Sequence, residues 1–362
     1  DEAYVTMPNQ LGIDEFDLED ALGDQVNHMC SADLGEFIEE NHLDLSVETT
    51  TPFNPRDAFG SHSDSDHVYN TPRAWVMQRF LNPYDEVWDG PDADHRPESN
   101  DIPWARQPER KVTIEDIKYV LSSHYQGTPY DPYGKLGDEH TRHLYRPIGI
   151  NRQSQLSVMQ IRPYRPQAYR AIQWIAYGSN PFNTLVPFYP NVNETPAYLE
   201  DTTTRVTTEN FYWESRVIAA LCDAAFADTS NAVERYQQKT GAMGHRFVAD
   251  TDALVAGIDG VWNIDDDATV EAEPAGDAAD ADAGARGDIF GLDDEDDDAD
   301  VQPMGDPDGI IAATRNAGVR EALTAANQRM ADALKKETDD LLDAVLYTTS
   351  MKMKNGFHMS DF

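Results

Sequence analysis

The stretch QLSVMQIRPYRPQAYRAIQWIAYGSNPFNTLVPFY (155–189) decides the fold class of this chain. It holds three short runs of β-branched, aromatic and aliphatic residues, at 155–162, 169–177 and 184–189. Proline, glycine and asparagine bound these runs, as is typical of strands. Strands this close together in sequence indicate antiparallel hairpins.

Helical patterns lie on both sides of these strands. Thr113 and Asp116 form a capping-box pattern before apolar residues at helical spacing, and Pro72 suits the first turn of another helix. A long amphipathic helix is expected from Gly309 to about Tyr347. The other expected helices cover 32–41, 70–81, 208–227 and 231–258. The predicted class is therefore α+β, with helices and an antiparallel sheet in separate layers.

The charge of the chain excludes several kinds of partner. The net charge is −38 over 362 residues. Nucleic acids and anionic membrane surfaces would repel such a protein. No apolar run approaches the ~18 residues of a membrane span, so no membrane partner is expected.

Much of the acidity is local, and it divides the chain. Residues 264–309 carry 18 Asp and Glu against one Arg and contain almost no aromatic residue. Such a composition cannot offset its ordering entropy, so 264–308 is predicted to be a flexible acidic insertion. It separates a main domain, 1–263, from a C-terminal helical segment, 309–362, that packs on it.

The cysteines and histidines give little chemistry by themselves. Cys30 and Cys222 provide neither a disulfide framework nor a metal motif, which favours a reducing, cytoplasmic location. Cys222 lies in an apolar helical run and is expected to be a buried small hydrophobe. His140 and His143 lack a third ligand, so neither a metal nor another cofactor is expected. The motifs of serine hydrolases, P-loops and dinucleotide folds are absent from the sequence.

Four stretches together resemble the dipeptidase A (PepD-type) family of bacteria. Their order along the chain is that of the family, and the segment His-Tyr-x-Gly-Thr-x-Tyr-Asp-Pro is the most specific part. The stretches are YVTMPNQLGIDEFD (4–17), YNTPRAWVMQRFLNP (69–83), VTIEDIKYVLSSHYQGTPYDPYG (112–134), and IQWIAYGSNPFNTLVPFYPNV (172–192) continuing to ENFYWESRVIAAL (209–221).

The resemblance implies an N-terminal-nucleophile hydrolase with a four-layer αββα sandwich of antiparallel sheets and C-terminal helices. The nucleophile of such an enzyme is a cysteine at the start of the mature chain, and its own α-amino group serves as general base. Neither cysteine of this chain matches that position. The chain is thus expected to be the C-terminal portion of a broad-specificity dipeptidase, missing its N-terminal strands, inactive alone and homo-oligomeric in its complete form.

The resemblance also implies site residues. Asn9 stands where related hydrolases place an asparagine that binds the developing oxyanion, and the alternative is a turn residue after Pro8. Arg73 stands where relatives place an arginine near the nucleophile, although it could be a surface residue at a helix start. Weaker candidates for lining the substrate pocket are Gln10, His124, Tyr125, Thr128 and Tyr130.

Substrate recognition follows from the class of reaction. A dipeptidase must recognise a free α-amino group and a free carboxylate close together, which requires an acidic side chain for the first and an Arg or Lys for the second. Two alternatives remain open. One is an amide-bond acylase of the same fold, of the penicillin V or bile salt type. The other is a non-catalytic protein whose acidic segment binds basic partners.

Overall fold

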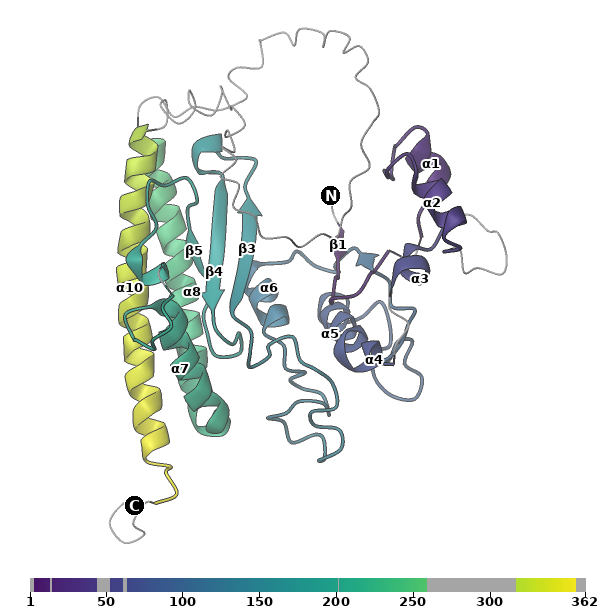
Figure 1. Cartoon of the computed structure of the whole chain (residues 1–362). Coiled ribbons are helices and arrows are strands. Elements are labelled where there is room, and N and C mark those ends of the chain that lie inside the picture. Colours follow the sequence, from purple (N-terminus) through teal and green to yellow (C-terminus); the bar gives the residue numbers. More distant parts are fainter. Residues whose placement is uncertain are drawn as a thin grey trace, which may run out of the picture.

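The computed structural model describes residues 3–13, 15–43, 53–60, 64–200, 202–258 and 317–355. The predicted acidic insertion lies outside the described residues, as does the start of the predicted C-terminal helix. Figure 1 shows the arrangement: a small sheet, a layer of long helices on one side of it, and a group of short helices on the other.

The three predicted strands form one antiparallel sheet in the order β3-β4-β5. They are β3 (Gln155–Ile161), β4 (Ala171–Tyr177) and β5 (Val186–Phe188). The β3–β4 register aligns Val158 with Trp174, and the β4–β5 register aligns Trp174 with Pro187. Pro187 lacks a backbone donor, which an edge strand such as β5 can accommodate. The prediction of antiparallel hairpins is confirmed.

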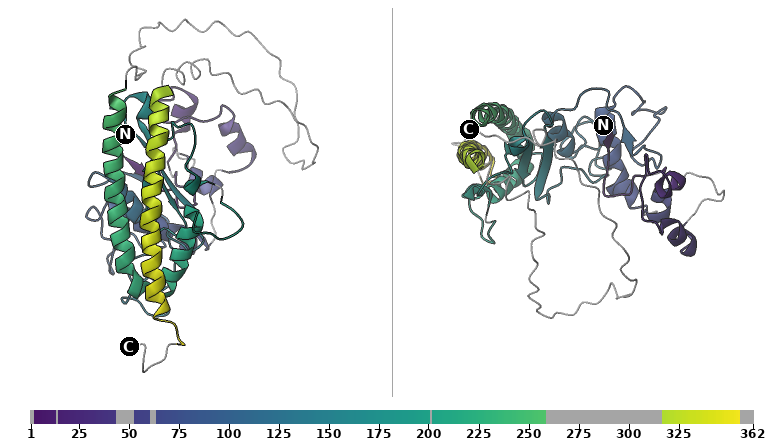
Figure 2. Two further views of the ribbon diagram at one scale, coloured as in Figure 1. Left: turned by 90° about the vertical axis from the view of Figure 1, so that its left-hand side faces the viewer. Right: turned by 90° about the horizontal axis from the view of Figure 1, so that it is seen from above.

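Three long helices form a layer beside the sheet. They are α7 (Phe211–Ala224), α8 (Phe226–Ala256) and α10 (Ala317–Ser350). In Figure 2, α8 and α10 run side by side along their length. The apolar stripe predicted on the last helix is buried at every position named for it, namely Val319, Leu323, Met330, Leu334, Leu341 and Val345.

The remaining elements are short and lie mostly in the first 121 residues. The strands β1 (Tyr4–Val5) and β2 (Ala105–Arg106) pair antiparallel. The helix α6 (Ile114–Leu121) begins with the predicted capping box, in which Thr113 and Asp116 bond to each other's backbone. The other helices are α1 (Leu18–Leu22), α2 (Leu34–Glu40), α3 (Pro55–Phe59), α4 (Asp66–Tyr69) and α5 (Thr71–Leu81), with 3-10 turns η1 (Gln167–Tyr169) and η2 (Ala197–Leu199).

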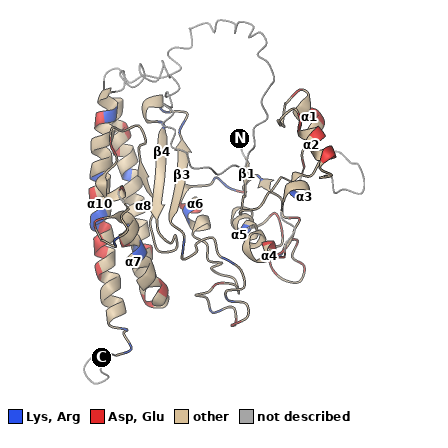
Figure 3. Ribbon diagram, in the orientation of Figure 1, with Lys and Arg blue, Asp and Glu red and all other residues tan. Residues whose placement is uncertain are grey.

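Helices and an antiparallel sheet in separate layers confirm the α+β class. The sheets among the described residues have three and two strands, so the four-layer sandwich stays a prediction. Charge is distributed unevenly over the elements: acidic residues mark α1 and α2, whereas α10 carries both signs (Figure 3).

A buried ion pair joins the sheet to the helical layer. Arg162, directly after β3, donates two hydrogen bonds to the carboxylate of Asp252 on α8, at 2.6 and 3.0 Å. The same carboxylate accepts a hydrogen bond from the Tyr189 hydroxyl at 2.8 Å, and Arg162 also donates to the Tyr169 carbonyl. Every charge in this network therefore has directional partners, which a buried ion pair requires.

Replacement of Asp252 by Asn should destabilise the chain by about 3–5 kcal/mol, because it leaves the Arg162 guanidinium buried without a counter-charge. Urea unfolding followed by circular dichroism measures this loss. The matched control is Asp250→Asn on the same helix, where the side chain is exposed and a change within about 0.5 kcal/mol is expected. Equal stabilities of the two variants would contradict the assigned role.

A glycine permits the close approach of α8 to the sheet. A Cβ atom added at Gly244 would lie 2.7 Å from Cδ of Pro187 in β5 and 3.5 Å from the Trp174 ring. At Gly241, one turn earlier on the same helix, an added Cβ meets no atom within 4 Å. The absent side chain thus matters at Gly244 but not at Gly241.

The variants Gly244→Ala and Gly241→Ala should change stability in opposite directions. Both gain about 1 kcal/mol of helix propensity. Only Gly244→Ala forces α8 away from β5, at a cost of about 1–3 kcal/mol. Thermal and urea unfolding of the two variants should therefore differ by that amount, with Gly241→Ala the more stable. If the Gly244→Ala variant is as stable as Gly241→Ala, α8 and β5 can accommodate the added methyl group without a measurable cost.

Candidate functional site

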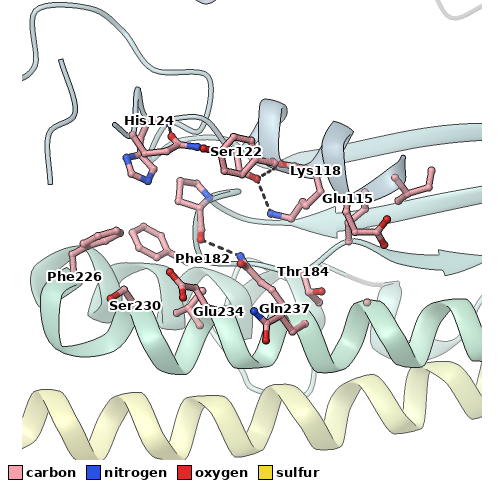
Figure 4. A pocket seen from close by; sticks show the side chains of 18 of the residues that line it. Glu115, Lys118, Ser122, His124, Phe182, Thr184, Phe226, Ser230, Glu234 and Gln237 are labelled. Carbon is pink, nitrogen blue, oxygen red and sulfur yellow. Dashed lines mark hydrogen bonds between the residues drawn. The ribbon is translucent and has the colours of Figure 1, made fainter. Parts of the chain in front are cut away.

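A cavity of about 590 Å³ lies between α6, the β4–β5 connection and α8 (Figure 4). Its walls are largely apolar, with a few polar groups directed into it. The apolar lining residues include Ile114, Pro181, Phe182, Leu185, Phe226 and Val233, and the polar ones include Glu115, Lys118, Ser122, His124, Asp131, Ser230, Glu234 and Gln237. A cavity of this size and polarity is suited to a small ligand.

Lys118 is the cation of this cavity, and it is partly buried near the end of α6. Its ammonium donates hydrogen bonds to the Ser122 hydroxyl at 2.7 Å and to the Asn180 carbonyl at 2.6 Å. Both acceptors are uncharged, so they do not compensate the desolvation of the ammonium. Burial consequently lowers the pKa of Lys118 to about 7.

His124 lies on the wall of the same cavity. Its Nδ1 is 2.9 Å from a carboxylate oxygen of Asp131, which orients the ring. The ring also makes edge contacts with Tyr133 and Phe226. The structure therefore places His124 on the wall of a cavity, and its role in lining the substrate pocket stays a prediction.

Asn9 and Gln10 lie elsewhere, in a bend four residues beyond the end of β1 and not at its last residue as expected, and Gln10 lies beside the start of α5. Asn9 has a φ of 68°, a left-handed conformation that asparagine tolerates better than most residues. Its side chain is exposed and bonds to none of the described residues. Gln10 lines a small cleft together with Thr71 and Ala74 of α5. The Asn9 turn therefore lies against the helix that also carries Arg73.

Arg73 is half-buried and is connected to the loop after α6. Its Nε donates to the Arg146 carbonyl at 3.4 Å, and the Tyr125 hydroxyl donates to the same carbonyl at 3.0 Å. Burial lowers the pKa of Arg73, and the nearby charges of Arg146 and Arg152 lower it further. The structure thus brings together two of the predicted site residues, Arg73 and Tyr125.

Tyr125, Thr128 and Tyr130 form the compact turn that follows α6. The Thr128 hydroxyl donates to the Tyr125 carbonyl at 2.7 Å and accepts from the Tyr130 amide at 3.2 Å. Tyr125 is almost fully buried and has a φ of 65°. Its ring packs against those of Tyr130 and Tyr145. The turn separates His124, at the cavity, from Tyr125, on the Arg73 side.

The model of the family described as peptidase family C69 matches residues 1–239. The chain belongs to this family. It is 76% identical over all 362 residues to a protein named dipeptidase from Bifidobacterium longum (strain NCC 2705), of which it covers 64%. It is 40% identical over 361 residues to a probable dipeptidase A from Streptococcus pyogenes serotype M18, of which it covers 61%.

A third relative is similar over a shorter part of the chain. Dipeptidase A from Lactobacillus helveticus is 36% identical over 260 residues, which are 72% of this chain and 52% of that protein. The chain spans about three fifths of the length of the first two relatives. These findings confirm the resemblance to the dipeptidase A family.

Three cations near the candidate sites lie among the described residues but were not singled out from the sequence, namely Lys118, Arg146 and Arg152. Lys118 occupies one position of an amphipathic helix and resembles an ordinary solvated lysine in the sequence. Arg146 lies in a loop without a motif. The described residues contain no group of three or more potential metal ligands. They also contain no helix that is long and apolar enough to cross a membrane.

The stability of the C69 chain should reveal the altered titration of Lys118. An unfolded lysine titrates near 10.4, whereas the folded-state pKa of Lys118 is about 7. Between these values the unfolded state binds more protons, so the contribution of Lys118 to stability rises with pH, by at most about 1.4 kcal/mol per unit. Below pH 7 this contribution is constant and least favourable.

Urea unfolding of wild type and Lys118→Met between pH 6 and pH 10 measures this effect. The stability of wild type relative to the variant should rise above pH 7. Burial raises the pKa of Glu214 to about 8, but Glu214 titrates in both proteins and its effect cancels in the difference. The exposed Lys135→Met serves as control and should give a flat difference. A flat difference for Lys118→Met as well would refute the lowered pKa.

Proposed function

We propose that the protein containing this chain is a dipeptidase that hydrolyses dipeptides through a cysteine nucleophile and an acyl-enzyme. The observation that carries the proposal is the 76% identity, over the whole chain, to a protein named dipeptidase within peptidase family C69. The nucleophile is proposed to lie in a part of the protein that precedes residue 1. Broad dipeptide specificity, a homo-oligomeric state and a cytoplasmic location are part of the same proposal.

The chemical step assigns one role to Asn9. The thiolate attacks the scissile carbonyl carbon, and the carbonyl oxygen becomes an oxyanion. An amide N–H of Asn9 donates a hydrogen bond to this oxygen and needs no protonation to do so. The C–N bond then breaks, the amine leaves with a proton, and water hydrolyses the thioester. The side chain of Asn9 is exposed and bonds to none of the described residues, which supports this role.

Arg73 has the second role, which is electrostatic. A guanidinium beside a cysteine stabilises the thiolate and so raises its concentration at neutral pH. Arg73 has no carboxylate at salt-bridge distance among the described residues, and its charge therefore remains available. The half-burial of its side chain strengthens its interaction with a neighbouring anion.

The four-layer sandwich is proposed for the complete protein. Among the described residues, β3 is an edge strand with a free side. Its side chains Met159 and Ile161 are 64% and 60% exposed, which is unusual for apolar residues on one face of a central sheet. A second sheet supplied by the rest of the protein would cover this face at the usual packing distance of about 10 Å.

The variant Asn9→Ala, made in the full-length gene product, should lower kcat for Leu-Leu by about 10²- to 10³-fold and change KM little. The reason is that the amide acts on the oxyanion, which exists only after attack. Amino-acid release measures the rate, and circular dichroism verifies folding. Asn151→Ala, an exposed asparagine in another turn, is the matched control and should retain full activity.

A kcat of Asn9→Ala within threefold of wild type would remove Asn9 from the mechanism. The activity itself is tested with wild type and a panel of substrates. Cleavage of dipeptides supports the proposal, whereas cleavage of penicillin V or conjugated bile salts without dipeptide cleavage would favour the acylase alternative.

A further inference from the structure

Three arginines lie together beside the proposed active site, and among the described residues none of them has a carboxylate at salt-bridge distance. They are Arg73 on α5, Arg146 in the loop that follows the α6 turn, and Arg152 shortly before β3. Asp and Glu outnumber Lys and Arg by 66 to 28 in this chain. The feature that sets these three apart is that the charges of Arg146 and Arg152 act on Arg73.

Contacts fix the position of Arg146 but leave its charge uncompensated. Its backbone amide donates to the Val68 carbonyl, and its own carbonyl accepts from Arg73 and Tyr125. Its guanidinium lies over the ring of Tyr69, with 5.7 Å between the central carbon and the ring centroid. Its Nε is buried and has no hydrogen-bond acceptor among the described residues. A buried donor in a native protein normally has a partner, so this atom indicates a missing acceptor.

The charges of Arg146 and Arg152 both act on Arg73. After burial, the charges of Arg146 and Arg152 are the causes that lower the pKa of Arg73, while Tyr125 opposes them. The guanidinium groups are thus close enough to repel, and an anion between them would relieve the repulsion. Arginine suits a carboxylate best, since its planar fork can donate two parallel hydrogen bonds.

We propose that Arg146, assisted by Arg152, binds the free α-carboxylate of the dipeptide substrate. This inference rests on the proposed function. In a dipeptide the carboxylate belongs to the residue directly after the scissile carbonyl, and neighbouring residues are only about 3.8 Å apart. The cation that binds the substrate carboxylate must therefore lie next to Arg73, the cation proposed to stabilise the thiolate. Arg146 has this position relative to Arg73, because Arg73 Nε donates to the main-chain carbonyl of Arg146 and the side-chain charge of Arg146 acts on Arg73.

The test compares Leu-Leu with Leu-Leu-amide in the full-length gene product. Wild type should prefer the free carboxylate. The variant Arg146→Gln should raise KM for Leu-Leu about 10- to 100-fold, the usual effect of losing a hydrogen bond to a charged group, and leave KM for the amide unchanged. Arg146→Lys keeps the positive charge but loses the two parallel donors of the guanidinium, and should recover part of the preference for Leu-Leu over Leu-Leu-amide.

The matched control is Arg142→Gln, which removes one positive charge from the same loop and should retain the wild-type preference. Thermal unfolding of each variant separates a folding defect from a binding defect. Equal losses on the two substrates, or an unchanged KM for Leu-Leu in folded Arg146→Gln, would overturn the assignment. Equal losses would instead indicate that Arg146 holds a carboxylate of the protein itself.

The failure of this inference differs from the failure of the proposed function. If wild type cleaves Leu-Leu but Arg146→Gln does so with the same KM, the carboxylate site is wrong and the dipeptidase proposal stands. If wild type cleaves no dipeptide, the dipeptidase proposal fails. Calorimetric titration with acetyl-leucine then decides the site alone: weaker binding by Arg146→Gln than by Arg142→Gln supports it, and equal binding overturns it.

Discussion

The buried network around Asp252 is the interaction on which the framework depends. Asp252 on α8 receives Arg162 from the end of β3 and the hydroxyl of Tyr189 from the end of β5. The backbone of Tyr189 in turn exchanges two hydrogen bonds with the side chain of Asn327 on α10, at 3.0 and 2.9 Å. Sheet, α8 and α10 thus meet at one point, where burial leaves no water to replace a lost partner.

This framework also fixes the segment that links β4 to β5. Gln237 of α8 donates to the carbonyls of Pro181 and Asn183, and Lys118 of α6 donates to the carbonyl of Asn180. Both α6 and α8 therefore bind this segment, and the segment forms part of the wall of the cavity between the two helices. Burial lowers the pKa of Lys118 to about 7, because the neutral oxygens of Ser122 and Asn180 do not replace a counter-charge for the ammonium.

Electrostatics separates the two candidate sites on either side of the α6 turn. On the cavity side, His124 is paired with Asp131 and acidic residues share the lining. On the Arg73 side, the charges of Arg146 and Arg152 act on Arg73 and have no such partners among the described residues, and Gln10, the neighbour of Asn9, lines a cleft at the start of the same helix. The net charge of this chain is −38, so most of its surface repels anions. A local excess of cations therefore distinguishes a site that can bind an anionic group from the rest of the surface.

The sequence by itself determined the local elements and the family. The capping box of Thr113 and Asp116, the strand runs of β3 and β4 and the stripe from Val319 to Val345 each depend on near neighbours, and the structure has them. The break expected between 227 and 231 was wrong in position, because α8 begins at Phe226 directly after Ala225. The proximity of Arg73, Arg146 and Tyr125 required the tertiary structure. These residues are up to 73 positions apart, and no periodicity or motif encodes which loop carbonyl a buried guanidinium will reach.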